Sequence, residues 1–242
     1  VRTLAREFAH VLYEVGFETV VPIKSYEAIE RALLSGDIDA AWGPPMVCAK
    51  VESAGGMVAL QGVRQGATTY RSVLLCRAHD DLSLSEIGQP GLRKLRACWV
   101  DRWSMGGYIM PRHHLRTQGV ALEEAFIEET LLGSYDACFD AVLNGDADIT
   151  ASYASARGIG YVELCGSEAY QLRTLAYTEE CPNDGVVISP SPIESPKAIF
   201  ERIDTLLDSS AKRQTLARAL AVDDFEAPAA RTYSDLLTLL NQ

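Results

Sequence analysis

Apolar residues along the chain alternate between helical and strand-like spacing, which predicts an α/β protein. The first helix has its apolar positions between Leu4 and Val15 and is closed by Gly16. Further helices are predicted at 26–34, 107–118, 135–143 and 195–207. The pattern is helical again up to 220 and finally at 233–240. Strands are predicted at 17–23, 38–42, 57–60, 72–77, 95–100, 125–130, 147–151 and 173–177. This alternation favours mostly parallel sheets flanked by helices.

One helix-and-strand unit occurs twice, as AIERALLSGDIDAAWGPP at 28–45 and as ACFDAVLNGDADITASYAS at 137–155. Each copy is an amphipathic helix, a glycine, an Asp-x-Asp sequence and a short apolar strand. Gly36 and Gly145 stand where a helix ends in the left-handed conformation, which costs least without a Cβ atom. We interpret the four aspartates of the two copies as capping and turn residues rather than paired carboxylates: Asp37, Asp39, Asp146 and Asp148.

The repeat predicts two similar lobes. The layout suggests a discontinuous lobe 1 formed by 1–76 and 178–242, a lobe 2 formed by 77–177, and a ligand cleft between them. A βαβ lobe normally begins with a strand, so either a strand precedes Val1 or the lobe is built differently, and we favour an upstream segment. Because ligands bind beyond the carboxyl ends of parallel strands, the residues at the end of each repeat should face this cleft. These are Trp42-Gly43-Pro44 in the first repeat and Ser152-Tyr153 in the second.

Composition narrows the functional classes. A formal net charge of −11 argues against a nucleic-acid partner, which requires clustered Lys and Arg, but leaves a small anion possible at a helix N-terminus. No stretch approaches the about 20 apolar residues of a membrane-spanning helix, and residue 1 enters a helical pattern without a visible signal peptide. The six cysteines have irregular spacing without a C-x-x-C pair, so we expect no structural metal site. We also expect no cofactor. They favour a reducing compartment mildly, and one or two disulfides remain open.

Four segments together resemble a known family. They are the unit at 29–45, TTYRSVLLCRA at 68–78, DRWSMGGYIMP at 101–111, and GSYDACFDAVLNGDADI at 133–149 followed by ECPNDGVVISP at 180–190. The chain resembles the type 2 periplasmic-binding-protein fold, most closely the PhnD-like phosphate, phosphite and phosphonate substrate-binding proteins of ABC transporters. The resemblance implies a two-lobed protein that closes around a small polar, possibly anionic ligand. It also implies an ABC permease as partner and a periplasmic or cell-surface location, with a cytoplasmic location not excluded.

Two motifs differ from the family pattern. Where the family has a Ser-Thr-Ser run, this chain has Ser104-Met105-Gly106. One hydroxyl group is therefore kept, and a methionine thioether takes the place of another. The family's Gly-Ser-His is replaced by a sequence that ends in Tyr135, whose phenol donates one hydrogen bond but carries no positive charge at neutral pH. The ligand's charge is therefore open.

The loop 101–108 is the strongest site candidate, because it joins a buried strand to a helix and its glycines let a ligand approach the backbone. Asp184 is equally well interpreted as a ligand acceptor or as a turn residue. Arg71 and Arg102 could supply the positive charge that Tyr135 lacks, or they could be surface residues. His113 and His114 are expected at the surface. The predicted ligand-binding residues are Trp42, Gly43, Tyr70, Trp103, Ser104, Met105, Gly106, Gly107, Tyr135, Tyr153 and Asp184, whereas Tyr108 is expected to pack in a lobe.

Three functions remain as alternatives. A solute-binding protein is favoured, because no catalytic triad or dyad can be assigned from spacing. A cytoplasmic enzyme of the lyase or cofactor-biosynthesis type could use the same fold, and the cysteines are its support. A ligand-sensing module of a longer regulatory chain is the third.

Overall fold

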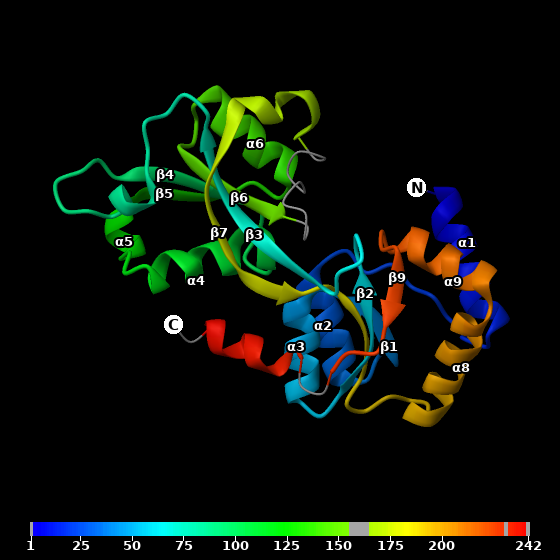
Figure 1. Ribbon diagram of the computed structural model, residues 1–242. Helices are drawn as coiled ribbons and strands as arrows, with labels where there is room; N and C mark the ends of the chain where they lie inside the picture. Colours follow the sequence, from blue (N-terminus) through cyan, green and yellow to red (C-terminus); the bar gives the residue numbers. More distant parts are fainter. Residues whose placement is uncertain (1, 155–164, 230–231, 241–242) are drawn as a thin grey trace. The chain divides into compact units, whose positions relative to one another are not determined.

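The computed structural model describes residues 2–154, 165–229 and 232–240, so that Ser155, the last residue of the second repeat, lies outside the described residues. The chain divides into two compact units (Figure 1): unit 1 comprises Val1–Thr68 and Pro182–Leu237, and unit 2 comprises Thr69–Cys181 and Thr238–Gln242. The boundaries expected after residues 76 and 177 fall inside two strands, β3 (Thr69–Arg77) and β7 (Leu172–Pro182). The chain thus changes unit where β3 begins and where β7 ends.

Unit 1 is a four-stranded sheet with the order β1-β8-β2-β9 and helices packed on it. Its elements are α1 (Arg2–Glu14), α2 (Tyr26–Ser35), β1 (Ala40–Gly43), α3 (Pro45–Ser53), β2 (Met57–Val63), β8 (Gly185–Ile188), α8 (Pro196–Asp208), α9 (Ser210–Ala219), β9 (Asp224–Glu226) and most of the 3₁₀ helix η4 (Ser234–Leu240).

The expectation of mostly parallel strands is wrong for unit 1. Strand β8 pairs antiparallel with both β1 and β2, and β2 pairs antiparallel with β9. Ala40 and Met57 both pair with Ile188, so β1 and β2 run in the same direction with β8 inserted between them. The physical reason is that the chain returns to unit 1 just before β8, which then runs antiparallel to β1 and β2. The local sequence pattern of a strand does not record the direction in which it enters a sheet.

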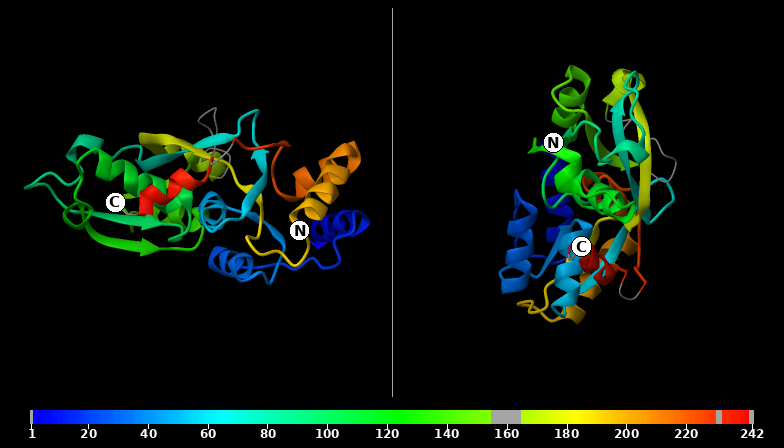
Figure 2. Two further views of the ribbon diagram at one scale, coloured as in Figure 1. Left: turned by 90° about the horizontal axis from the view of Figure 1, so that it is seen from below. Right: turned by 90° about the vertical axis from the view of Figure 1, so that its left-hand side faces the viewer.

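The helices of unit 1 pack on the sheet and on one another. Helices α2 and α3 contact each other and strands β1, β2 and β8. Helices α1 and α9 lie side by side although they come from opposite ends of the chain (Figures 1 and 2). The ion pair between Lys212 Nζ and Glu14 Oε2, 3.2 Å apart, joins these two helices. The core combines helix and sheet residues such as Ile188, Ile199 and Phe225.

Unit 2 is a five-stranded sheet with the order β5-β4-β6-β3-β7. Its further elements are η1 (Leu84–Glu86), β4 (Leu95–Trp99), the π-helical turn η2 (Met105–Ile109), α4 (Met110–Thr117), α5 (Leu122–Ala125), β5 (Phe126–Leu131), α6 (Tyr135–Asn144), β6 (Ile149–Ala154) and η3 (Gly166–Gln171). Strand β4 pairs parallel with β5 and β6, whereas β3 pairs antiparallel with β6. The sheet is therefore mixed, again because β3 is a crossing strand.

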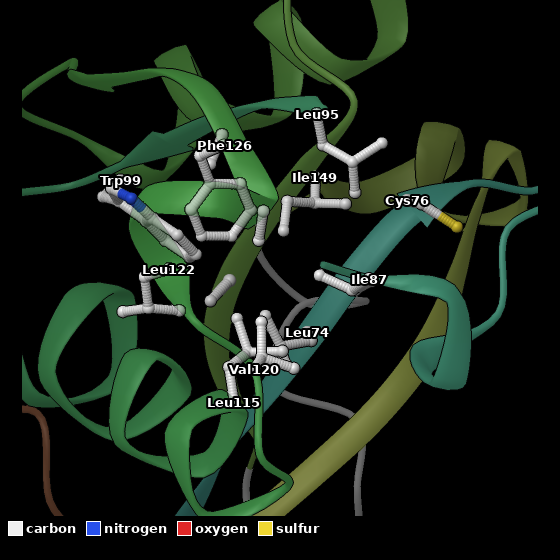
Figure 3. Close-up of a cluster of buried hydrophobic side chains, with 13 residues drawn as sticks. Leu74, Cys76, Ile87, Leu95, Trp99, Leu115, Val120, Leu122, Phe126 and Ile149 are labelled. Atoms are coloured by element: carbon white, nitrogen blue, oxygen red, sulfur yellow. The ribbon is translucent and has the colours of Figure 1, made fainter. Parts of the chain in front are cut away.

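The main core of unit 2 lies against one face of this sheet. Figure 3 shows Trp99 and Phe126 packed with Leu122, Leu115 and Ile149. The rings of Trp99 and Phe126 meet edge to face, with 6.0 Å between their centroids. A second cluster on the other face buries Phe139 and Val142 of α6. The two clusters hold β4 and β6 rigidly, and these strands lead into the candidate site.

The predicted repeat is confirmed. Helices α2 and α6 each begin at a serine, Ser25 and Ser134, whose side chain accepts the N–H of the residue three positions on. Each helix ends at its glycine in the left-handed conformation, Gly36 with φ 75° and Gly145 with φ 83°. Serine at the start and glycine at the end satisfy backbone groups that a helix terminus leaves unpaired. Local sequence thus determines both copies of the helix-and-strand repeat.

Three element predictions need correction. In the described chain, residues 17–23 form no strand, and Pro22 within them lacks the N–H that a ladder needs. The helix predicted at 107–118 begins earlier, with the π-helical turn η2, and the helix predicted at 233–240 is of the 3₁₀ type. The sequence pattern did not predict α3, β8 and β9. Segments this short, or apolar throughout, show no clear hydrophobic periodicity.

Candidate ligand-binding site

In unit 2, the chain turns sharply after β4 and opens a helix at Ser104. The Ser104 Oγ accepts the N–H of Gly107 at 3.0 Å, and the Ser104 carbonyl accepts the N–H of Ile109 at 3.0 Å, five residues on. The turn is stiffened by the Trp103 N–H, which donates to Asp101 Oδ1 at 2.6 Å. The N–H groups of Met105 and Gly106 stand in the first turn, where a helix offers them no acceptor. This is the geometry with which a helix N-terminus binds an anion.

The glycines of this turn are required by close packing. A Cβ atom on Gly106 would lie 3.2 Å from Tyr135 Oη and 3.3 Å from Tyr153 Cβ. A Cβ atom on Gly107 would lie 2.6 Å from a methyl group of Val100. The close neighbours of both glycines are thus protein atoms, the phenol of Tyr135 among them, and both glycines are buried.

Two tyrosines complete this part of unit 2. Tyr135 is the first residue of α6, directly after its cap, and its ring meets that of Tyr153 edge to face with 5.9 Å between centroids. Tyr135 also stacks on Phe139, with 6.4 Å between centroids. The structure thus brings together Ser104, Gly106, Tyr135 and Tyr153, all predicted from the sequence. The turn at Ser104 and the start of α6 both direct the positive end of a helix dipole to this region.

Two buried serines lie beneath the turn: Ser152, which the sequence predicted at the cleft, and Ser72, which sequence reasoning did not single out. Ser72 of β3 donates its hydroxyl to the carbonyl of Gly106 at 2.5 Å, and its N–H donates to Thr178 Oγ1 at 2.9 Å. Ser152 of β6 is fully buried, and in the described residues its Oγ has no hydrogen-bond partner. A hydroxyl inside an otherwise apolar strand was the available signal, since a buried polar side chain normally has a specific partner.

The other predicted residues of unit 2 take different positions. Met105 is 2% exposed, so its thioether belongs to the interior rather than to an open surface. Tyr70 and Trp103 are half-buried, and Arg102 is exposed. Tyr108 packs edge to face on Trp99 with 6.3 Å between centroids, which confirms the expectation that it packs in a lobe.

In unit 1, three predicted residues meet at one edge of the sheet, where β1 ends and β8 begins. Gly43 pairs with Gly185 across the two strands, next to Asp184. Trp42 packs edge to face on Phe225, with 6.2 Å between centroids. Its ring also covers Gly62 of β2, where a Cβ atom would lie 2.9 Å from Trp42 Cη2. We call this arrangement of Trp42, Gly43, Gly62 and Asp184 the unit 1 edge.

The Asp184 carboxylate is held by an arginine that sequence reasoning did not consider. Arg64 Nη2 donates to Asp184 Oδ2 at 2.7 Å, and Arg64 Nε donates to the carbonyl of Ala221 at 3.1 Å. Arg71, which the sequence offered as a possible cation, pairs with Glu180 at 3.2 Å, with both side chains about half exposed. A hydrogen bond from Thr69, followed by that from Arg71, lowers the pKa of Glu180 below its usual value.

Two further expectations are corrected by burial. His114 is only 8% exposed, and its Nδ1 lies 3.6 Å from Glu179 Oε2, so it is not a surface residue. Asp148 is 1% exposed and accepts hydrogen bonds from the backbone and side chain of Arg96, so it is a buried ionic centre and not a turn residue. Both residues are buried by neighbours that are distant in sequence.

The described chain contains no disulfide, and five of its six cysteines are buried. Burial raises the pKa of the Cys48 thiol, with a smaller contribution from the charge of Asp184. Among the described residues, no cluster of His, Cys, Asp and Glu is arranged to hold a metal ion. None of the described helices combines the length and the apolar character that a membrane span requires.

Solved structures with the same fold come from several bacteria. The binding-protein component of an ABC phosphonate transporter from Pseudomonas aeruginosa is 21% identical over 99% of this chain and 80% of that chain, with a TM-score of 0.76. The PhnD1 protein from Prochlorococcus marinus, in complex with methylphosphonate, is 17% identical over 99% and 92%, with a TM-score of 0.75. A Xanthomonas citri protein bound to ATP is 17% identical over 98% and 89%, with a TM-score of 0.74.

These similarities show that the fold is that of the type 2 periplasmic binding proteins, as predicted. No curated protein matches the chain by sequence. The model of one family, described as "ABC transporter, phosphonate, periplasmic substrate-binding protein", matches residues 8–233. Because this match spans most of the sequence, the chain belongs to the family of periplasmic substrate-binding proteins of phosphonate ABC transporters.

Proposed function

We propose that this chain binds a phosphonate at the turn that opens η2 in unit 2 and delivers it to the permease of an ABC importer. Membership of the family makes it a substrate-binding protein with a small-molecule ligand and a permease partner, and it does not support the enzyme weighed from the sequence. The choice of phosphonate, and of the residues that hold it, is our proposal. The observation that carries it is the juxtaposition of the Ser104 turn with the phenol of Tyr135.

The chemistry of this turn suits a tetrahedral oxyanion. The first-turn N–H groups of Met105 and Gly106 can each donate to one oxygen, and the helix dipole favours the negative charge. Tyr135 Oη supplies a further donor close to Gly106. An oxyanion held by backbone N–H groups requires no neighbouring cation, so the replacement of the family's histidine by Tyr135 is compatible with this ligand class.

A capping-serine variant tests the proposal. Ser104→Ala removes the hydroxyl that fixes Gly107, so the N–H groups of the turn lose their alignment. We expect the Kd for methylphosphonate, measured by isothermal titration calorimetry, to rise about tenfold or more, equal to about 1.4 kcal/mol. The matched control is Ser195→Ala in unit 1, since Ser195 Oγ caps α8 by accepting the N–H of Ala198 at 3.2 Å. Both variants should lose about 1 kcal/mol of stability.

Only the Ser104 variant should lose affinity. Equal Kd values for the two variants would contradict the placement of the site, and no heat with methylphosphonate for the unaltered protein would contradict the ligand class. Inorganic phosphate and sulfate, titrated in parallel, test whether the carbon–phosphorus ligand is preferred.

A tyrosine pair gives a second test of the same site. Tyr135→Phe removes one donor beside Gly106 and should weaken methylphosphonate binding about fivefold to tenfold, while the packing on Phe139 is kept. Tyr108→Phe is the control, because Tyr108 packs on Trp99 within the lobe. If Tyr135→Phe bound as tightly as Tyr108→Phe, the phenol would have no part in the site.

The family also suggests where the protein works. We propose a periplasmic location for the natural protein, from which it serves the importer. Fractionation of cells that express the natural gene product, with a known cytoplasmic protein as marker, tests this. Recovery together with the cytoplasmic marker would contradict it.

A further inference from the structure

We propose that Ser72 is a positioning residue of the ligand site in unit 2. Its hydroxyl holds the peptide unit between Gly106 and Gly107 in the orientation that the turn needs to bind an anion. This inference rests on the proposed phosphonate-binding function and adds to it a residue that acts from another strand. Ser72 belongs to β3, 34 positions before Gly106, and it acts through the backbone of the turn rather than by contact with the ligand.

The turn cannot continue its own hydrogen-bond pattern at Gly106. The carbonyl of Met105 accepts the N–H of Met110, five residues on, which continues the series that begins at Ser104. The next bond of this series would join the carbonyl of Gly106 to Pro111, which has no N–H. A buried carbonyl without a donor is costly, so the carbonyl of Gly106 needs a donor from outside the turn.

Ser72 supplies this donor. Its Oγ donates to the carbonyl of Gly106 at 2.5 Å, whereas a second carbonyl, that of Ser152, lies farther away at 3.2 Å. The residue is fully buried, so water does not compete for the bond. Ser72 is itself held in place, because its N–H donates to Thr178 Oγ1 at 2.9 Å and it pairs with Tyr153 in the ladder of β3 and β6. The hydroxyl therefore has a fixed position beneath the turn.

The bond fixes a peptide plane that two glycines would otherwise leave free to rotate. The carbonyl of Gly106 and the N–H of Gly107 belong to one peptide unit. Ser72 holds this unit at its oxygen, and Ser104 Oγ holds it at its nitrogen at 3.0 Å. Because a glycine stands on each side, the plane can rotate once either bond is lost. A rotated plane breaks the cap at Ser104 and so releases the first-turn N–H groups that the proposed function assigns to the oxyanion.

A matched pair of serine variants tests this role. Ser189 of unit 1 makes the same kind of bond, because it is 3% exposed and its Oγ donates to the carbonyl of Leu33 at 2.7 Å. Ser72→Ala and Ser189→Ala each remove one buried hydroxyl donor, and both should lower Tm. In isothermal titration calorimetry with methylphosphonate, Ser72→Ala should raise Kd about tenfold, and Ser189→Ala should leave it within about twofold. Equal Kd values for the two variants would overturn the inference.

Amide hydrogen exchange gives a second readout that needs no ligand. In the ligand-free protein, followed by NMR, the N–H of Gly107 should exchange about tenfold faster in Ser72→Ala than in Ser189→Ala, because its peptide unit is released. Equal exchange rates would refute the hold of Ser72 on the turn. If methylphosphonate gives no heat with the unaltered protein, the proposed function is wrong, and the exchange rate still decides whether Ser72 positions the turn.

A change at Pro111 tests the reason for the bond. Pro111→Ala restores an N–H five residues after Gly106, so the carbonyl no longer depends on Ser72 alone. In this background, Ser72→Ala should raise Kd only about threefold or less, and an undiminished tenfold rise would overturn the explanation through the Gly106 carbonyl. Should Ser72→Ala not fold, Ser72→Cys decides, because a thiol is a weak donor of nearly the same size. Its Kd should rise about threefold, and a Kd equal to that of the unaltered protein would refute the inference.

Discussion

Replacing Asp148 by asparagine should destabilise unit 2 strongly although the two side chains have the same shape. Asp148 follows the helix of the second repeat, and its carboxylate is buried among arginines. Oδ2 accepts the backbone N–H of Arg96 at 2.8 Å, and Oδ1 lies 3.0 Å from Nη2 of the same residue. Arg93 Nη1 at 3.3 Å and Arg77 Nη2 at 3.6 Å are further cations around Oδ1. Asparagine keeps an acceptor but removes the negative charge that three arginines share, of which Arg77 keeps its pair with Asp80 at 2.8 Å.

The size of the effect follows from burial. Breaking a fully buried ion pair typically costs about 3–5 kcal/mol. The side chains of Arg93 and Arg96 are 63% and 37% exposed, so water can solvate both once the carboxylate has gone. Only Arg77, at 13%, remains largely buried. We therefore expect a loss of about 2–3 kcal/mol, which lowers Tm by roughly 5–10 °C.

The effect should depend on pH with a definite sign. Burial alone would raise the pKa of Asp148, but hydrogen bonds from Arg96 and the charge of Arg93 outweigh it and lower the pKa below its usual value. A lowered pKa means that the charged carboxylate stabilises the fold above the ordinary aspartate pKa of about 3.9. This stability is lost as the pH falls from there through the pKa of the folded protein. The deficit of Asp148→Asn should therefore be constant near neutral pH and shrink below about pH 4.

Thermal and urea unfolding followed by circular dichroism, at pH 7 and at pH 3.5, measures both effects. Asp146→Asn is the matched control, because Asp146 belongs to the same Asp-x-Asp sequence, carries the same charge and is exposed. Its stability should stay within about 0.5 kcal/mol of the unaltered protein. Equal Tm values for the two variants at pH 7 would refute the reasoning, as would a deficit of Asp148→Asn that is undiminished at pH 3.5.

Two further predictions concern stability. Gly36→Ala should lower the free energy of unfolding, measured in urea, by about 1 kcal/mol or more beyond the loss caused by Gly119→Ala. Both glycines have positive φ, but only at Gly36 would the Cβ atom lie 2.6 Å from a backbone oxygen, that of Ser191. Equal losses would show that the left-handed conformation alone sets the cost. Tyr233→Phe should lower the stability of unit 1 by about 1–1.5 kcal/mol, because the buried phenol donates to the carbonyl of Asn183 at 2.6 Å; an unchanged Tm would contradict this.

The candidate site was predictable where function depends on local backbone geometry. Ser104 and Gly106 lie in a strand-to-helix turn whose composition signals close approach, and Tyr135 is the first helical residue after Ser134, which caps α6. The supporting residues were not predictable in this way. Ser72 reaches the carbonyl of Gly106 from another strand, so its role exists only once β3 and η2 are packed together.

The sequence by itself determined the helix-glycine-strand units, because a capping serine, a glycine with positive φ and an apolar stripe act within a few residues. The tertiary structure alone decided the direction of β8, which enters antiparallel between β1 and β2. It also decided the different fates of the two aspartates in one motif: Asp146 is solvated, whereas Asp148 is buried against arginines from other segments. The same holds for Arg64, which meets Asp184 across 120 positions. Electrostatic energy depends on distance and burial in space, and a linear pattern of residues records neither.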